Sequence, residues 1–245
     1  MPRAARLKSE GGFYHIVNRG IGKQIIFEDD EDYERFLSTI SRFQEEEKFS
    51  VLAYCLMDNH FHLLLRADDS PAQIMKKISC SYAYYFNDKY GRSGHLFQDR
   101  YTSEAVNDEK YLLAVVRYIH NNPQKAGICK REEYHWSSYV EYLSSSGITD
   151  RTLVLDLTGG IPGFEEFSAG NEEVECMDIS TRERLTDAEA IKYIIKKLKV
   201  ISPTDLQSYA RPERDAALAK LKNAGLSIRQ IERLTGINRG VILKS

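Results

Sequence analysis

The sequence predicts an α+β fold, a ferredoxin-like split βαβ antiparallel sheet with helices on one face, followed by a small all-α, helix-turn-helix-like module. Three observations predict it. Short β-rich runs and longer helical patterns alternate in the order β-α-β-β-α-β-α, whose first six members match the split βαβ pattern. An Asp58-Asn59 pair separates two of the β-rich runs, as in a tight hairpin. The last part of the chain is helical in pattern throughout.

The boundaries of these elements follow from local chemistry. Acidic residues crowd the start of the first helix, where the helix dipole favours them. Ser70 and Pro71 suit the beginning of the second helix, Asp108 suits the N-cap of the third, and Pro123 stops it. The expected strands are 12–19, 49–57, 60–66 and 96–106, and the expected helices of this part are 27–47, 71–90 and 109–122.

Composition indicates an ordinary globular protein. Of 245 residues, 42% are hydrophobic and 29% charged, and no run approaches the ~18 apolar residues that a membrane span needs. The basic N-terminus lacks the apolar core of a secretory signal. The four cysteines show no close pairing, so we expect neither a zinc site nor a disulfide framework, and a cytoplasmic location.

Charge is distributed unevenly along the chain. Residues 146–190 hold 3 Lys and Arg against 11 Asp and Glu, whereas residues 191–245 hold 12 against 4. A basic segment behind an acidic one indicates a separate module with an anionic partner. The predicted domains are a nuclease or transposase domain at 1–145, an acidic linker or irregular arm at 146–185, and a basic, helical DNA-binding domain at 186–245.

Two histidines stand one residue apart in the run "MDNHFHLLL". On a strand, His60 and His62 face the same way, ~6.5–7 Å apart along the chain, so both imidazoles can bind one metal ion. Taken alone, this spacing favours two partly exposed histidines on a sheet surface. A metal site therefore needs a third group from elsewhere in the chain.

The helix before Pro123 offers such a group. Tyr118 and Asn122 are four residues apart and share a face, and the Asn122 carbonyl oxygen is a hard ligand suited to Mg²⁺ or Mn²⁺. The alternative is an ordinary core stripe in which Asn122 ends the helix. His120 is expected on the far side of the helix from Tyr118, so the sequence assigns no base to Tyr118.

Six ordered segments within about residues 8–143 resemble the single-tyrosine HUH transposases, and among them most closely the REP-associated tyrosine transposases. The segments are "YHIVNRG", "FEDDEDYERFL", "AYCLMDNHFHLLL", "GHLFQDRY", "YIHNNPQKAG" and "WSSY". In this resemblance, His60 and His62 fall on the His-hydrophobic-His metal motif, Tyr118 on the nucleophile, and Asn122 on the third metal ligand.

The resemblance implies a metal-dependent transposase or nickase, an HUH-type single-strand DNA endonuclease and strand transferase. It would cleave and rejoin hairpin-forming single-stranded DNA through a covalent 5′-phosphotyrosine intermediate, with Mg²⁺ or Mn²⁺ as cofactor. Insertion-sequence relatives are dimers and repeat-associated relatives are monomeric, so a monomer and a homodimer both remain open.

Further basic residues are expected to contact DNA, although each also suits an ordinary surface charge. In the tail, "LSIRQIERLTGINRGVI" resembles a helix-turn-helix that contacts duplex DNA through phosphates, and a three-helix bundle for protein contact is the alternative. The expected DNA-binding residues are Arg19, Arg100, Lys125, Arg229, Arg233, Arg239 and Lys244.

Two other functions compete with catalysis. One is a non-catalytic DNA-binding regulator that acts through the helix-turn-helix tail. The other is an RNA-binding ferredoxin-like module, which is disfavoured because the first strand lacks paired aromatic residues and histidines occupy sheet positions that base stacking requires.

Overall fold

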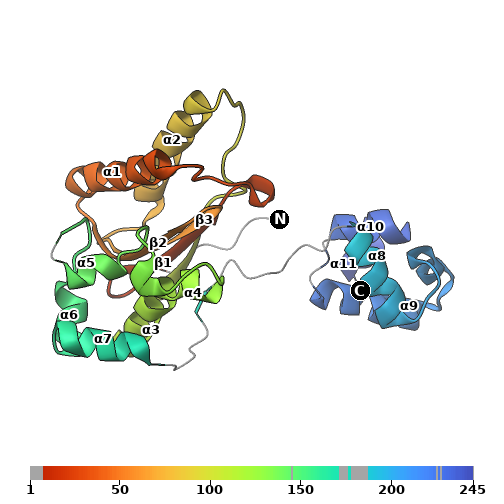
Figure 1. Cartoon of the computed structure of the whole chain (residues 1–245). Helices are drawn as coiled ribbons and strands as arrows, with labels where there is room; N and C mark the ends of the chain where they lie inside the picture. The colour runs from red at the N-terminus through yellow and green to blue at the C-terminus, as the bar shows by residue number, and fades with distance from the viewer. Residues whose placement is uncertain are drawn as a thin grey trace. The chain divides into compact units, whose positions relative to one another are not determined.

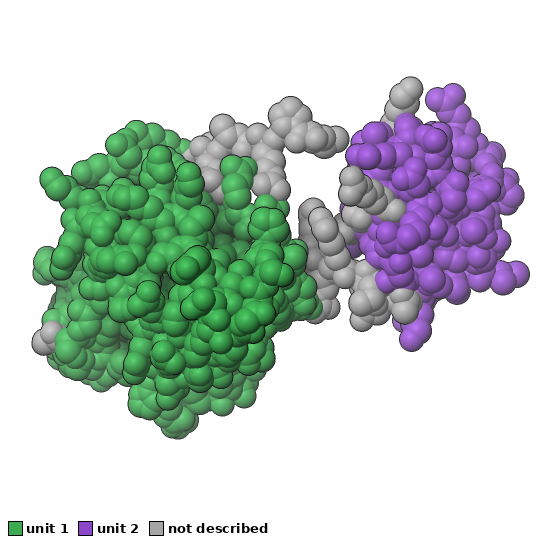
Figure 2. All heavy atoms as spheres, turned by 90° about the horizontal axis from the view of Figure 1, so that it is seen from above, with its two compact units in different colours: residues 1–178 green, residues 179–245 purple. Residues whose placement is uncertain are grey.

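The computed structural model describes residues 8–144, 146–170, 176–177, 187–224, 226 and 228–244, without the side chains of 188, 189, 223, 229 and 244. Figure 1 shows its helices and strands. The chain divides into two compact units, residues 1–178 and 179–245, which Figure 2 colours separately. No helix in the described ranges combines the length and the apolar character needed to cross a membrane.

The first unit is built on a four-stranded antiparallel sheet in the order β2-β3-β1-β4. This order confirms the predicted ferredoxin-like fold, in which the hairpin strand β3 and the last strand β4 flank β1. The strands are β1 (Phe13–Arg19), β2 (Ser50–Met57), β3 (His60–Arg66) and β4 (Thr102–Val106).

Helices cover both faces of the sheet (Figure 1). The two helices of the split βαβ pattern, α1 (Asp30–Glu47) and α2 (Ala72–Lys89), pack on the face that carries Ile16, Phe61 and Leu63. The helix that follows β4, α3 (Glu109–His120), packs on the opposite face in a second core. The sequence predicted that α1 and α2 share a face but assigned no face to α3.

Caps and one buried ion network fix these helices. Asp29 and Asp108 accept hydrogen bonds from the backbone amides of Asp32 and Tyr111, which satisfies open donors at the starts of α1 and α3. The carboxylate of Asp32 is fully buried and accepts bonds from Lys89 Nζ at 3.0 Å and from the hydroxyls of Tyr85 and Tyr90. This network joins α1 to α2 at the helix ends.

Several boundaries differ from the sequence-based expectation. Strand β4 starts at Thr102, and of the expected residues before it only Phe97 pairs, in an isolated bridge with Gly20. Asn122 lies beyond the end of α3, in the short helix α4 (Asn122–Lys125), because Pro123 lacks an amide hydrogen and suits a new first turn. Short helices η1 (Ile21–Lys23), η2 (Arg131–Glu133) and α5 (Tyr139–Leu143) complete the connections.

The expected acidic arm is helical in part. Residues 152–169 form α6 (Thr152–Thr158) and α7 (Ile161–Ala169), and Val154 and Phe164 are fully buried in the core that contains α3. The irregular-arm expectation was therefore wrong for these residues. The apolar pattern of this segment is weak, but a few of its apolar residues are buried and hold the two helices against the core. Of the rest of the arm, 171–175 and 178–185 lie outside the described residues.

The second unit has its own core, formed by residues such as Ile194, Leu218 and Ile231. Gly236 adopts a positive φ of 70° between the last two helices, and a side chain there would collide with Gln207. Gly236 therefore provides a turn between these two helices. The elements of the unit are α8 (Asp187–Leu198), η3 (Pro203–Ser208), α9 (Arg211–Asn223), α10 (Ile228–Thr235) and α11 (Arg239–Lys244).

Replacing Phe36 with alanine is expected to lower the free energy of unfolding of the first unit by about 3–5 kcal/mol. Phe36 is fully buried, and the centroid of its ring lies 4.7 Å from that of Phe61 and 5.0 Å from that of Tyr82. The measurement is urea unfolding followed by fluorescence of Trp136, the single tryptophan, which stacks on Tyr33 of α1 and so reports on this unit.

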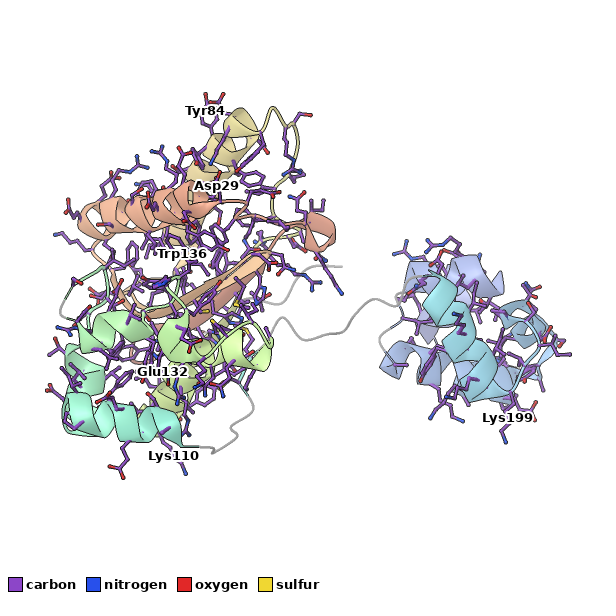
Figure 3. The ribbon with its side chains drawn as sticks, in the orientation of Figure 1. Asp29, Tyr84, Lys110, Glu132, Trp136 and Lys199 are labelled. Atoms are coloured by element: carbon purple, nitrogen blue, oxygen red, sulfur yellow. The ribbon has the colours of Figure 1, made fainter. Side chains whose placement is uncertain are left out.

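Tyr84→Ala is the matched control, because this aromatic residue of α2 is 78% exposed and points away from the sheet (Figure 3). It should change the stability by no more than about 0.5 kcal/mol. Equal effects of the two substitutions would contradict the core assignment of Phe36.

Candidate active site

The site lies on the face of the sheet that α3 covers. In the antiparallel register, Arg19 is opposite His60 and Val17 is opposite His62, so these side chains share a face with His15, two residues along β1. The ring centroids of His60 and His62 are 5.2 Å apart. The strand thus brings the two predicted imidazoles together, although His62 is fully buried instead of partly exposed.

His62 is paired on one side of its ring only. Its Nδ1 lies 3.2 Å from Nε2 of His15, another fully buried imidazole. Its Nε2 is buried and has no hydrogen-bond partner among the described residues. Burial lowers the pKa of His15 to about 3 and that of His62 well below its usual range, because a charged ring loses its hydration. Both rings are therefore neutral, the form that binds metals.

His60 is oriented by the hairpin turn. Its Nδ1 lies 2.6 Å from Oδ1 of Asn59, an atom that only accepts, so Nδ1 carries the proton. Nε2 is then the acceptor atom of the His60 ring. The turn that makes the hairpin also fixes the tautomer of the first histidine.

Tyr118 comes from α3, more than fifty residues after the histidines. Buried Leu112, Val115 and Ile119 hold this helix against the sheet. The Tyr118 ring meets His62 edge-on, with centroids 5.6 Å apart, and lies 5.9 Å from His15. The side chain is 9% exposed, at the border of the core and the surface. The structure thus places the predicted nucleophile beside the predicted metal-binding histidines.

Asn122 is anchored to the end of α3. Its Nδ2 donates to the carbonyl oxygen of Tyr118 at 3.0 Å. A carbonyl only accepts, so the amide nitrogen must face the helix and Oδ1 must face away from it. The side chain therefore closes the helix end and presents the hard oxygen that Mg²⁺ or Mn²⁺ prefers.

The expected donor atoms, two imidazole nitrogens and one amide oxygen, are of types that a divalent metal accepts. Within the described ranges, no three His, Cys, Asp or Glu side chains gather as a metal site. The unpaired Nε2 of His62 is the observation that favours a cation here, because a buried ring nitrogen without a partner is costly.

The basic residues expected in the first unit differ in position. Lys125 of α4 places its ammonium 4.6 Å from the centroid of the Tyr118 ring. Arg19 lies beside His60 in the register and donates from Nε to Gln98. Arg100 is exposed in the segment before β4, and no described contact joins it to the histidines.

Two of the four expected tail residues have described side chains. The side chains of Arg229 and Lys244 lie outside the described residues. Arg233 forms a hydrogen-bonded ion pair with Asp187 of α8, which holds the pKa of that carboxyl below its usual value. Arg239 is exposed at the start of α11.

His120 does not reach the site. It is fully buried on the far side of α3, as expected, where its Nε2 lies 2.8 Å from Ser138 Oγ and its ring packs on Tyr142. His15 is the site residue that sequence reasoning missed. The signal was present in "YHIVNRG", whose alternation places the imidazole on the face of the sheet that carries His62.

Comparison with known proteins confirms the predicted resemblance. The family model described as "Transposase IS200 like" matches residues 9–122, which contain all four candidate site residues. No match was found among curated proteins.

Two solved structures are similar to this chain. A REP-associated tyrosine transposase bound to a REP hairpin is 18% identical over 62% of this chain and 90% of its own, with a TM-score of 0.51, which supports the fold. A candidate transposase from Deinococcus radiodurans R1 is 17% identical over 49% of this chain and 94% of its own, with a TM-score of 0.35.

The buried state of His120 predicts a pH dependence of stability. Burial lowers the pKa of His120 to about 3, whereas an unfolded histidine titrates near about 6.5. Between these values the unfolded chain binds a proton that the folded chain does not. Stability should therefore fall as the pH drops below about 6.5, by up to about 1.4 kcal/mol per pH unit from this residue.

His120→Phe should make this fall shallower, as measured by urea unfolding between about pH 7 and about pH 4. His95→Phe is the control. Because His95 is exposed, this variant should keep the full pH dependence of stability. If His120→Phe keeps it too, His120 does not stay neutral in the folded protein.

Proposed function

We propose that this chain, which carries an IS200-like transposase domain at residues 9–122, cleaves and rejoins single-stranded, hairpin-forming DNA through Tyr118. The observation that carries the proposal is the meeting of His60, His62 and Tyr118 on one face of the sheet. A nucleophile beside two imidazoles on one face is the arrangement that metal-assisted phosphoryl transfer needs.

His60, His62 and Asn122 would hold the divalent metal, Mg²⁺ or Mn²⁺. When bound there, the ion would polarise the scissile phosphate and offset its developing negative charge. Nε2 of each histidine and Oδ1 of Asn122 are the donor atoms, and each side chain is oriented by a hydrogen bond at its other polar atom.

Tyr118 would attack phosphorus with its phenolic oxygen. The new Oη–P bond replaces the bond from phosphorus to the 3′ oxygen, so the products are a 5′-phosphotyrosine and a free 3′-hydroxyl. The phosphodiester energy is retained in this link, which allows a later 3′-hydroxyl to reverse the step and rejoin the strand. A second nucleophile such as water is not required.

Cationic side chains support the reaction. A phenol has a pKa of about 10, so Tyr118 needs help to become a phenolate. The Lys125 ammonium over the Tyr118 ring stabilises negative charge on that ring and at the phosphate next to it. Arg19 lies opposite His60 at the end of β1 and would contact a neighbouring phosphate of the strand.

The hairpin form of the DNA is proposed by analogy. The similar structure is that of a transposase bound to a REP hairpin, and this chain shares its fold. We propose a hairpin-forming repeat or element end as the substrate class. In this proposal the enzyme works in the cytoplasm, as a monomer or a homodimer.

The second unit would provide duplex contact, to the hairpin stem or a flanking helix. It has a separate core, and exposed basic residues such as Lys196, Lys197 and Arg239 surround it. Positive charge around a small helical unit favours phosphate binding. The regulator function, duplex binding without nicking, rests on this unit alone.

Tyr118→Phe should abolish the covalent adduct between the protein and a labelled single-stranded hairpin in Mn²⁺ or Mg²⁺, because the attacking oxygen is gone. EDTA should abolish the adduct of the unsubstituted protein, through loss of the metal. The measurement is a denaturing gel that separates protein-linked DNA from free DNA.

Tyr111→Phe is the matched control for this experiment. Tyr111 lies on the same helix, but its hydroxyl donates to Glu104, so the variant should form the adduct at nearly the normal rate. If hairpins from the host genome give no adduct while duplex DNA still binds, the regulator replaces the nicking enzyme as the function.

Arg239→Ala should weaken duplex binding and lower the slope of log K against log salt by about 1, because one phosphate contact and its released counterion are lost. The measurement is fluorescence anisotropy of a labelled duplex over a salt series. Ile201→Ala is the exposed but uncharged control, and should leave the slope unchanged. An unchanged slope in Arg239→Ala would remove α11 from the proposed interface.

A further inference from the structure

His15 is a buried imidazole that the proposed chemistry does not use. It lies in the middle of β1, where the register places it opposite Leu64 of β3 and Glu104 of β4. It is fully buried, and its Nε2 lies 3.2 Å from Nδ1 of His62 with the two rings stacked at 5.4 Å. Its other nitrogen, Nδ1, has no hydrogen-bond partner in the described part of the chain.

A neutral imidazole carries one proton, so the contact between the two rings has a direction. For Nε2 of His62 to offer a lone pair to a cation, the proton of that ring must be on Nδ1. Nδ1–H then donates to Nε2 of His15, which must be the acceptor. This assignment uses the nitrogen-nitrogen contact between the two rings.

We propose that His15 is a positioning residue that holds His62 in the Nδ1-protonated tautomer and aims its Nε2 at the divalent metal. The inference rests on the proposed metal site of His60, His62 and Asn122. A hydrogen bond at the far nitrogen of a metal-binding histidine fixes the ring orientation and raises its basicity.

His15 itself does not bind the same ion. Its Nε2 contacts Nδ1 of His62 and not the proposed metal-binding nitrogen, and its Nδ1 has no partner among the described residues. Packing alone does not explain the residue either. A phenylalanine would fill this volume without leaving a buried Nδ1 unpaired. The imidazole therefore lowers the folding stability, and its hydrogen bond to His62 is the contact that a phenylalanine could not make.

The first test measures Mn²⁺ affinity of the full chain by electron paramagnetic resonance of free Mn²⁺. His15→Phe keeps the ring volume and removes the acceptor, and should weaken Mn²⁺ binding by about 10-fold to 100-fold. His15→Gln should restore most of the affinity, because its amide oxygen reaches the position of the histidine Nε2 and accepts a hydrogen bond.

His120→Phe is the matched control. His120 is also fully buried with an unpaired Nδ1, but it bonds to Ser138 outside the site. This variant should lose folding stability and keep its Mn²⁺ affinity. If His15→Phe and His120→Phe reduce the affinity alike, the effect is structural and the proposal is overturned.

The second test locates the proton. In ¹⁵N-labelled protein saturated with Mg²⁺, the proton should be on Nδ1 of His62, with a coupling across the hydrogen bond to Nε2 of His15. A proton on Nε2 of His15 would overturn the proposal even if His15→Phe binds metal weakly.

The outcomes distinguish failure of the proposed metal site from failure of the proposed role of His15. If the unsubstituted protein binds Mn²⁺ and His62→Ala does not, the metal site stands, and normal affinity in His15→Phe then overturns the role of His15 alone. If the unsubstituted protein does not bind Mn²⁺, with or without hairpin DNA, the proposed metal site fails and the role of His15 fails with it.

Discussion

The antiparallel register between β1 and β3 is the constraint on which the site depends. Side chains alternate between the faces of a strand, so a shift of one residue would exchange the two faces. In the observed register, Phe61 and Leu63 enter the core under α1 and α2, while His60 and His62 face the side of α3. The same pairing that buries the apolar core therefore determines where the imidazoles lie and which neighbours they meet.

The end of α3 is the second structural feature on which the site depends. Pro123 supplies no amide hydrogen for the carbonyl of Ile119, four residues before it, so the helix cannot continue through it unchanged. The Asn122 side chain donates to the carbonyl oxygens of Tyr118 and Ile119 at this helix end. One short sequence thus ends the helix, orients an amide oxygen and holds Lys125 over the Tyr118 ring. Because these features share four residues, a substitution at Pro123 would disturb all of them together.

The sequence predicted the sheet, the Asp58-Asn59 hairpin and the capped start of α3, because each depends on residues close together in the chain. It also predicted that His60 and His62 share a face, since that requires only the period of a strand. It did not predict the pairing of His15 with His62 or the packing of α6 and α7, because both depend on contacts between distant segments. The family resemblance named candidate residues, but the ring distances and the unpaired Nε2 of His62 came only from the structure.

The division of the sheet into two faces also explains how the fold tolerates its buried imidazoles. His15 and His62 each leave a ring nitrogen unpaired among the described residues, and both must stay neutral when buried, so they lower the stability of the folded state at acidic pH. The opposite face holds a large aromatic and aliphatic core with α1 and α2, which needs no polar atoms from the site. The core with α1 and α2 therefore excludes the polar groups of the site, while the α3 face combines its own apolar core with the polar groups that metal-assisted chemistry requires.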